Sequence, residues 1–370
     1  MGERIAGALS LAIWLYLAFG HGRFWRTSVA LPHGVQPQRW PSVVAIVPAR
    51  DEAQVLPRTL PTLLAQRYPG PFRVIVVDDD SSDGTGGLAS AAGADVVRGS
   101  GPPPRWSGKV AAMATGVERA GEPDFLLFTD ADIAYPPDAV ITLVRAAVTN
   151  SLDLTSQMVR LRAESFWERM IVPAFVYFFA QLYPFARVNG TGRTAAAAGG
   201  CMLVRRSALV AAGGLAEIRG AVIDDVSLGR LLKRRGRIWL GLSEHIVSVR
   251  PYPRLADLWD MVARSAYTQL RYSLLLLLGT VVGLLITYVF PPAAVVVGLI
   301  LGDHLLVVLG AVAWLIMTAT YVPMLRHYSV APWRALLLPV IAVLYTAMTV
   351  DSARRHNAGR GAAWKGRVHG

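Results

Sequence analysis

The sequence is poor in cysteine and in charged residues. It has one cysteine, Cys201, which excludes an intrachain disulfide and a metal site built from several cysteines. Charged residues make up only 17% of the chain and hydrophobic residues 53%, a balance too apolar for a wholly soluble enzyme. The net charge is +12, but no recognised nucleic-acid-binding motif accompanies it, so we expect no nucleic-acid partner. These features favour a basic protein that lies on an anionic membrane surface.

An apolar stretch opens the chain. Residues 5–20 are followed by Arg23 and Arg26. We interpret 1–22 as an N-terminal membrane helix with its arginine side in the cytoplasm, because positive charges favour that side. A signal peptide is the alternative, but no clear cleavage site follows.

A second apolar region, residues 273–351, is predicted to be transmembrane. It contains candidate spans at 274–295, 305–325 and 333–350, each near the length of roughly 20 residues that crosses a bilayer. Pro291-Pro292 is expected to kink or end the first span. Three spans would place the basic tail, 352–370, outside, against the positive-inside rule, so the number of spans stays open.

Between these regions the sequence alternates strand and helix patterns. Short apolar runs at 43–47, 72–77 and 125–129 predict strands buried in a sheet. We expect a linker over 23–41 and, over 42–272, a Rossmann-like α/β domain with a mostly parallel sheet. Residues 165–187 are apolar and aromatic but are interrupted by prolines, and we interpret them as interfacial helices, an ordinary core helix being the alternative.

The segment Phe125–Ile133 carries the strongest chemical signal. Its apolar run ends in Asp130 and Asp132, one residue apart. Ligands of open α/β sheets bind at the carboxyl ends of strands. Two carboxylates at such an end are suitable ligands for Mg²⁺ or Mn²⁺ bound to the phosphates of a nucleotide. A turn-capping Asp130 and a solvated Asp132 are the alternative.

Several motifs resemble, in order, those of the family 2 inverting glycosyltransferases of GT-A fold. They are V-A-I-V-P-A-R-D-E (44–52), V-V-D-D-D-S-S-D-G-T (76–85), G-K (108–109), T-D-A-D (129–132), G-G-C-M-L-V (199–204) and the pair Asp224-Asp225. With Q-L-R-Y at 269–272 and W-K-G-R at 364–367, the pattern is most similar to the hopene-associated subgroup.

The resemblance implies roles on the donor side. Asp132 is expected to bind the metal directly, and Asp130 to contact the ribose or a metal-bound water. The remaining nucleotide-binding residues that it implies are Pro48, Ala49, Arg50, Glu52, Asp79 and Lys109. For Lys109, a solvated residue in the first turn of a helix is the alternative.

An inverting transfer also needs a base that takes the proton of the acceptor hydroxyl. The resemblance selects Asp225, with Asp224 as its neighbour. A carboxylate at a helix N-terminus is stabilised as the anion, so we expect Asp225 to be ionised. Helix capping is the alternative for both acids.

Acceptor-side roles are implied for Gly200, Arg271 and Tyr272, the last two as contacts to the acceptor or diphosphate. Processive synthases carry Q-x-x-R-W here, whereas this chain has Thr268 in place of the glutamine, which disfavours polymer synthesis. Interfacial anchoring is the alternative for Arg271 and Tyr272.

The sequence therefore predicts a multi-pass enzyme of the inner (plasma) membrane with a cytoplasmic catalytic domain. It would move a hexose from a nucleotide-diphosphate donor, a UDP-sugar, to a hydroxyl of a membrane lipid, hopanoid-related on the resemblance. A polyprenyl-phosphate glycosyltransferase and a non-catalytic membrane scaffold are the alternatives.

Overall fold

The computed structural model describes residues 1–359, 363–364 and 367–368, and their contacts form two compact units. The helical unit comprises Met1–Thr27, Ala163–Ala186 and the described residues of 252–362. The sheet unit comprises Ser28–Arg162, Arg187–Pro251 and the described residues of 363–370. This division differs from the linear borders at 42 and 272, because 163–186 and 252–272 group with the apolar helices. Each unit is described by itself.

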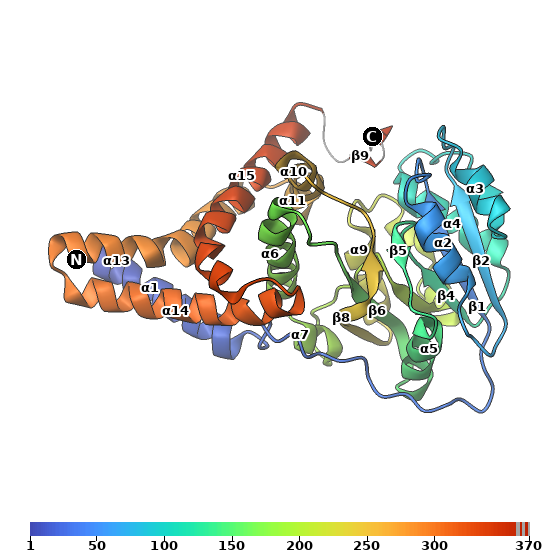
Figure 1. Cartoon of the computed structure of the whole chain (residues 1–370), viewed down its shortest axis with the longest axis horizontal. Coiled ribbons are helices and arrows are strands. Elements are labelled where there is room, and N and C mark those ends of the chain that lie inside the picture. Colours follow the sequence, from blue (N-terminus) through green and yellow to red (C-terminus); the bar gives the residue numbers. More distant parts are fainter. Residues whose placement is uncertain (360–362, 365–366, 369–370) are drawn as a thin grey trace. The chain divides into compact units, whose positions relative to one another are not determined.

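The sheet unit is built on one eight-stranded sheet in the order β3-β2-β1-β4-β7-β6-β8-β5 (Figure 1). Its strands are β1 (Val43–Ala49), β2 (Phe72–Asp78), β3 (Asp95–Arg98), β4 (Phe125–Phe128), β5 (Ile133–Ala134), β6 (Leu152–Arg160), β7 (Met202–Arg205) and β8 (Arg237–Ser248). A short pair, β9 (Ala363–Trp364) and β10 (Arg367–Val368), is separate.

The α/β class is confirmed, but the sheet is mixed. Neighbours within β3-β2-β1-β4 are parallel, and β6 is parallel to β8. β7 runs antiparallel between β4 and β6, and β5 antiparallel to β8. Because β7 enters from the opposite edge, its first residue, Met202, pairs with Phe128 at the carboxyl end of β4. Residues 199–201 therefore lie beside the D-x-D segment.

Helices connect these strands: α2 (Leu56–Leu64), α3 (Thr85–Ala91), α4 (Gly108–Ala120), α5 (Ala139–Thr149), α7 (Phe185–Asn189), α8 (Arg206–Ala211), η2 (Leu215–Ile218) and α9 (Asp224–Lys233). α4 approaches β1 so closely that a Cβ on Gly116 would lie 2.4 Å from Cγ2 of Ile46. This contact fixes α4, whose first turn carries Lys109, against the central strands.

The chain does not enter a helix directly after β1, because α2 begins only at Leu56. Asp51 has a φ of 50°, a left-handed conformation outside the α-helical region. The backbone N–H groups of residues 51–53 donate to the side chains of Ser81, Thr85 and Asp83 instead. The loop after β1 is thereby tied to the loop after β2.

The helical unit consists of helices connected by short turns. They are α1 (Gly2–Leu15) with η1 (Tyr16–Gly20), α6 (Phe166–Leu182), α10 (Leu255–Ala263), α11 (Ala266–Gln269), α12 (Leu274–Leu284) with η3 (Leu285–Val289), α13 (Phe290–Leu301), α14 (His304–His327), η4 (Pro332–Leu337) and α15 (Leu338–Asn357). Figure 1 shows α1 running alongside α13 and α14.

Four helical stretches in the described residues are long and apolar enough to cross a membrane: Gly2–Gly20, Leu274–Leu301, His304–His327 and Pro332–Asn357. The first two C-terminal spans were expected to end earlier. Pro291 and Pro292 do not interrupt the first of these C-terminal spans. They lie in the opening turn of α13, directly after the π-helical turn η3. Backbone N–H groups in the first turn of a helix have no partner within the helix, so the N–H that proline lacks is not missed there. Large side chains such as Leu275 and Ile300 are 78% and 77% exposed, which suits contact with lipid.

α6 is a core helix of this unit rather than an interfacial one. Ile171, Val172 and Val176 have no exposed surface. The Tyr177 hydroxyl and the Thr320 hydroxyl are 2.9 Å apart, and the Tyr345 hydroxyl donates to the carbonyl of Ile171. α6 therefore packs among α14 and α15 on its apolar and aromatic sides.

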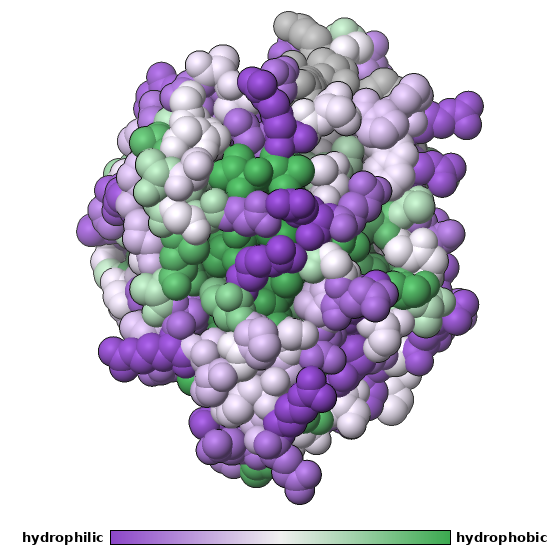
Figure 2. All heavy atoms as spheres, turned by 90° about the vertical axis from the view of Figure 1, so that its right-hand side faces the viewer, coloured by the Kyte–Doolittle hydropathy of each residue, from purple (hydrophilic) through white to green (hydrophobic). Residues whose placement is uncertain are grey.

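The predicted basic tail begins inside α15, where Arg354 and Arg355 both pair with Asp351. Arg360, Lys365 and part of the W-K-G-R segment lie outside the described residues. The face drawn in Figure 2, on the side of the sheet unit that carries β1, β2 and α3, is mostly hydrophilic, with apolar patches between the polar side chains. The exposed apolar side chains of α12 and α13 contrast with this surface.

Candidate active site

The carboxyl end of β4 places the two D-x-D carboxylates at the edge of the sheet. All four residues of β4 are buried, and the Thr129 hydroxyl donates to the Gly200 carbonyl at 2.9 Å. The Asp130 side chain is 37% exposed and that of Asp132 is 12% exposed. The strand thus ends with one accessible carboxylate and one nearly enclosed carboxylate.

Lys109 connects Asp130 to the acidic pair of α9. Its Nζ lies 2.8 Å from Oδ1 of Asp130 and 3.2 Å from Oδ2 of Asp224. Burial alone would lower the pKa of Lys109, but the surrounding carboxylates raise it above its usual range. Lys109 is therefore a fixed positive charge between the two acidic groups, and the solvated alternative is wrong.

Asp225 lies in the first turn of α9 and accepts two backbone hydrogen bonds. Its Oδ2 accepts from Gly199 at 2.9 Å, and its Oδ1 accepts from Val226 at 2.7 Å. Burial and the neighbouring Asp224 raise the pKa of Asp225 to about 7, although Lys109 and these hydrogen bonds act to lower it. Desolvation therefore opposes the stabilisation of the anion that the helix N-terminus was expected to give.

The two glycines before Cys201 have different roles. Gly199 faces the acidic cluster, since a Cβ there would lie 3.1 Å from Nζ of Lys109. Gly200 faces the core, since a Cβ there would lie 2.9 Å from the side chain of Val159. Gly200, which the sequence singled out, is a packing residue, and its neighbour contacts the candidate base.

A second charge network surrounds Asp132. Its Oδ2 accepts from the Ser248 hydroxyl at 2.6 Å and lies 3.3 Å from Nε of Arg250. Arg250 also pairs with Oε2 of Glu52 at 2.6 Å. Sequence reasoning missed Ser248 and Arg250. Ser248 is the last residue of β8 and Arg250 follows it by two, a position that the rule on strand ends could have indicated.

The predicted nucleotide-binding residues of β1 and β2 are adjacent. Asp79 donates its backbone N–H to the Ala49 carbonyl at 2.8 Å, next to Pro48. Arg50 donates to the Asp79 carbonyl at 2.6 Å, and its guanidinium is 3.7 Å from the Asp79 carboxylate. Arg50 follows β1 and Asp79 follows β2, so the two residues lie at the carboxyl ends of parallel neighbouring strands.

Arg271 and Tyr272 belong to the helical unit. Both have positive φ angles, 53° and 56°, which are uncommon for residues with side chains. The Tyr272 ring stacks on His356 at a centroid distance of 4.2 Å, and its hydroxyl accepts from Thr268 at 3.1 Å. Their acceptor role stays a prediction.

Divalent metal binding can be tested against the donor set. Among the described residues no group of three or more His, Cys, Asp and Glu side chains is arranged to hold a metal ion. Mg²⁺ sites that include substrate phosphates need only one or two carboxylates. In addition, Oδ2 of Asp224 is buried and makes no hydrogen bond, although Lys109 is near. The carboxylates therefore fit a cation that a bound diphosphate helps to hold.

Residues 44–211 match the family described as Glycosyl transferase family 2. The matched region contains Lys109, Asp130 and Asp132 and ends before Asp224. No curated protein gives a significant match. The predicted resemblance to family 2 glycosyltransferases thus agrees with the match over residues 44–211, while the hopene-associated subgroup stays a prediction.

The chain was also compared with solved structures, and the mannosyltransferase described next is similar in fold. A mannosyltransferase of Pyrobaculum calidifontis, in complex with GDP-Man and Mn²⁺, is 17% identical with a TM-score of 0.55, and the match covers 95% of this chain and 99% of that chain. Glucosyl-3-phosphoglycerate synthase of Mycobacterium tuberculosis is 18% identical with a TM-score of 0.41, covering 62% of this chain and 79% of that chain.

Proposed function

Because residues 44–211 match the Glycosyl transferase family 2 model, we propose that the protein transfers a sugar from a nucleotide-diphosphate donor to a lipid hydroxyl, with inversion. The observation that carries the proposal is the position of Lys109. Its Nζ lies within 3.2 Å of both Asp130 and Asp224. The ammonium group of Lys109 therefore joins Asp130 of the D-x-D segment to Asp224, the neighbour of the proposed base.

The donor nucleotide binds along the carboxyl ends of β1, β2 and β4. Asp79, whose backbone is held by Ala49 and Arg50, accepts hydrogen bonds from the base or ribose. Arg50 and Lys109 provide positive charge for the phosphates. These residues do not distinguish uracil from guanine, and a UDP-sugar is our first choice.

Mg²⁺ or Mn²⁺ would be held by Asp132 and Asp130 together with the diphosphate. When bound, it supplies positive charge that stabilises the diphosphate leaving group. Arg250 already contacts Asp132, so it keeps this carboxylate oriented and partly neutralised beside Ser248.

Asp225 acts as the base. Its pKa of about 7 lies near the pH at which a general base is both available and able to take a proton. The backbone N–H groups of Gly199 and Val226 hold its two oxygens, so the carboxylate keeps one orientation as the acceptor hydroxyl gives up its proton.

The four apolar helical stretches support a multi-pass membrane protein and a lipid acceptor. The assignment of the sheet unit to the cytoplasm rests on Arg23 and Arg26, which follow the first stretch. A membrane enzyme reaches a lipid hydroxyl without extracting the lipid into water, which would expose its apolar chain. A hopanoid-related lipid is the acceptor that the sequence motifs favour.

Calorimetry of UDP and GDP binding to the detergent-purified full chain tests the proposal. We expect nucleotide binding that strengthens with Mn²⁺ in the wild type and loses this metal dependence in Asp132→Ala. Asp225→Asn is the matched control, because it should bind nucleotide with Mn²⁺ normally yet lose sugar transfer. If folded protein binds neither nucleotide under any metal condition, the transferase proposal is wrong.

A further inference from the structure

The apolar helices of the helical unit divide into two groups by what they contact. α1, α13 and α14 contact one another, and they run side by side in Figure 1. α15 packs chiefly against a different set of elements, namely α6, α10, α11, α12, η3 and η4. α15 thus belongs to the second group by its packing, although its length and composition alone would allow a fourth span.

The helices of the first group share one end. Nε of Arg4, at the start of α1, lies 2.7 Å from Oδ2 of Asp303, in the turn between α13 and α14. α1 and η1 lead away from this end, and Nε2 of His21 lies 2.8 Å from the carbonyl of Gln181, near the end of α6. If these helices cross a bilayer, the Arg4–Asp303 pair is on one side of it and α6 is at the other.

α6 and α10 belong to the side of the membrane that holds the sheet unit. β6 precedes α6, whereas β7 and β8 follow it, and the three strands are hydrogen-bonded neighbours in one sheet. A single crossing by α6 would place β6 and β7 on opposite sides of the bilayer, so α6 does not cross. α10 begins at Leu255, shortly after β8 ends at Ser248, and it precedes the first C-terminal span.

α15 is attached to these two helices along its length. Just before α15 begins, the Arg334 guanidinium lies 5.8 Å from the ring centroid of Phe166, the first residue of α6. In the middle of α15, the Tyr345 hydroxyl donates to a carbonyl of α6. At its end, Arg355 pairs with Asp260 of α10 at 2.7 Å. Both ends of α15 therefore lie beside helices of the sheet-unit side, whereas the ends of a spanning helix are separated by a hydrocarbon core of about 30 Å.

The face of η4 and α15 that points away from this packing is an apolar stripe. Its exposed residues follow one another at intervals of three or four, which places them on one side of a helix. They are Trp333, Leu336, Val340, Val343, Ala347 and Val350. Trp333 begins the stripe, and Arg354, whose side chain is 76% exposed, follows its last residue by four. Tryptophan and arginine are residue types that anchor helices at membrane–water interfaces.

We propose that η4 and α15 lie in the plane of the membrane, with this stripe in the boundary between head groups and acyl chains on the side of the sheet unit. The chain then crosses the bilayer three times, through α1, through α12 with α13, and through α14. An apolar helix face with polar residues at its ends suits this boundary. The surface is continuous with lipid-facing side chains, because α12, against which α15 packs, exposes Leu275 and its neighbours.

The distribution of positive charge agrees with three crossings. Arg354 and Arg355, in the last turn of α15, then lie on the same side of the membrane as Arg23 and Arg26, which follow α1. Positive residues that flank membrane helices favour a single side, the cytoplasmic one. A fourth crossing by α15 would separate these two pairs. The inference goes beyond the proposed function, because it holds for any reaction that the sheet unit catalyses.

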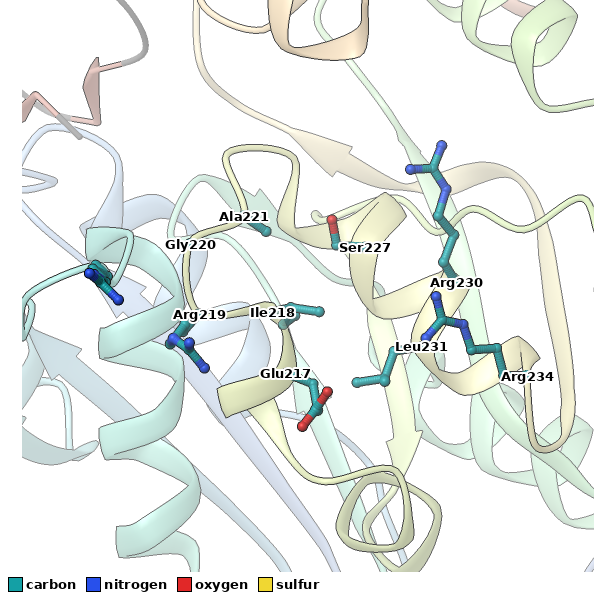
Figure 3. A pocket seen from close by; sticks show the side chains of 10 residues that line it. Glu217, Ile218, Arg219, Gly220, Ala221, Ser227, Arg230, Leu231 and Arg234 are labelled. Atoms are coloured by element: carbon teal, nitrogen blue, oxygen red, sulfur yellow. The ribbon is translucent and has the colours of Figure 1, made fainter. Parts of the chain in front are cut away.

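Cysteine labelling of the full chain in sealed membrane vesicles tests which side each segment occupies. The reporters are Leu301→Cys at the end of α13, Ala358→Cys directly after α15, and Arg234→Cys in the sheet unit. Arg234 is exposed and lines a cavity of about 550 Å³ between η2 and α9 (Figure 3). The native Cys201 is buried, so the unaltered chain gives the background. A membrane-impermeant maleimide is added before and after permeabilisation.

We expect Ala358→Cys and Arg234→Cys to be labelled under the same condition and Leu301→Cys under the opposite one. Labelling of Ala358→Cys together with Leu301→Cys would show a fourth crossing and overturn the inference. If Ala358→Cys and Arg234→Cys are both labelled from outside the cell, the in-plane helix stands and the assignment of the sheet unit to the cytoplasm fails. Labelling of all three from one side would overturn the three crossings.

The depth of the stripe is a second, independent measurement. Spin labels at Leu336→Cys, Val343→Cys and Val350→Cys are relaxed with oxygen, which enters lipid, and with a water-soluble nickel chelate. Successive sites are seven residues apart, about 10 Å along a helix axis. An in-plane helix holds all three at one depth, whereas a spanning helix places the Val343 site about 10 Å deeper than the other two.

α14 supplies the matched control for depth. Val308→Cys and Leu315→Cys are also exposed sites seven residues apart, and we expect their depths to differ by about 10 Å. A stripe with the same depth profile as α14 would overturn the inference. Labels on the stripe that neither oxygen nor the nickel chelate reaches would also overturn it, because protein rather than lipid would then cover this face.

Discussion

The pH dependence of sugar transfer should report the pKa of Asp225. With a pKa of about 7, raised by burial and by Asp224, Asp225 is protonated in acid and becomes a base only as the pH rises through 7. The kcat/KM should therefore fall to roughly a tenth of its plateau one pH unit below that pKa. An aspartate with an ordinary pKa near 4 would leave the activity flat over this range.

The two charged neighbours of Asp225 should move this transition in opposite directions. Lys109 lowers the pKa of Asp225 and Asp224 raises it. Loss of a charge at close range shifts a pKa by about 1–3 units. Lys109→Gln should thus move the transition to higher pH, and Asp224→Asn should move it to lower pH.

The assay is release of the nucleoside diphosphate from the donor, with a lipid extract as the source of acceptor, between about pH 5 and pH 9. The kcat/KM is used because it reports the free enzyme. Asp225→Asn should show no transition and little activity at any pH. A transition that stays in place in both Lys109→Gln and Asp224→Asn would refute the assignment of Asp225 as the base.

Three further predictions concern stability and metal binding. Gly116→Ala should destabilise the sheet unit by about 1–3 kcal/mol, because the new methyl group would overlap Ile46. Gly87→Ala in α3 is the control and should be neutral or stabilising, because its methyl group meets nothing within 4 Å. Thermal unfolding of the two variants measures the difference. Arg250→Met should cost about 2–4 kcal/mol, since it removes the guanidinium that pairs with Glu52 and Asp132, and Mn²⁺ should raise its melting temperature more than that of the wild type. Tyr177→Phe should lower the free energy of unfolding of the helical unit by about 1 kcal/mol, because the hydrogen bond to Thr320 is lost. Unfolding of the detergent-purified protein measures this change. An unchanged stability would show that Thr320 finds another partner.

Local sequence patterns were sufficient to predict the elements that carry the donor side. Buried apolar runs followed directly by acids predicted β1, β2 and β4 and placed Asp79, Asp130 and Asp132 at their ends. The direction of β7 was not predictable in this way. A four-residue strand has the same pattern whether it runs parallel or antiparallel, and only its pairing with β4 and β6 defines it.

The parts that sequence reasoning missed depend on contacts between distant residues. Ser248 and Arg250 meet Asp132 across 116 and 118 residues, because β5 pairs with β8. Residues 165–187 were predicted to be interfacial because they are apolar and aromatic. A buried helix among membrane helices has the same composition, so only the packing of α6 distinguishes the two.

The raised pKa of Asp225 follows from the composition of the cluster. One lysine faces three carboxylates, those of Asp130, Asp224 and Asp225, in a partly enclosed site. Lys109 can approach two of them closely, and it does so with Asp130 and Asp224, while Asp225 receives backbone N–H groups instead. Burial and the charge of Asp224 raise the pKa of Asp225, and Lys109 and the two backbone hydrogen bonds offset this rise only in part. The residue left without a lysine contact is therefore the one whose pKa suits a base.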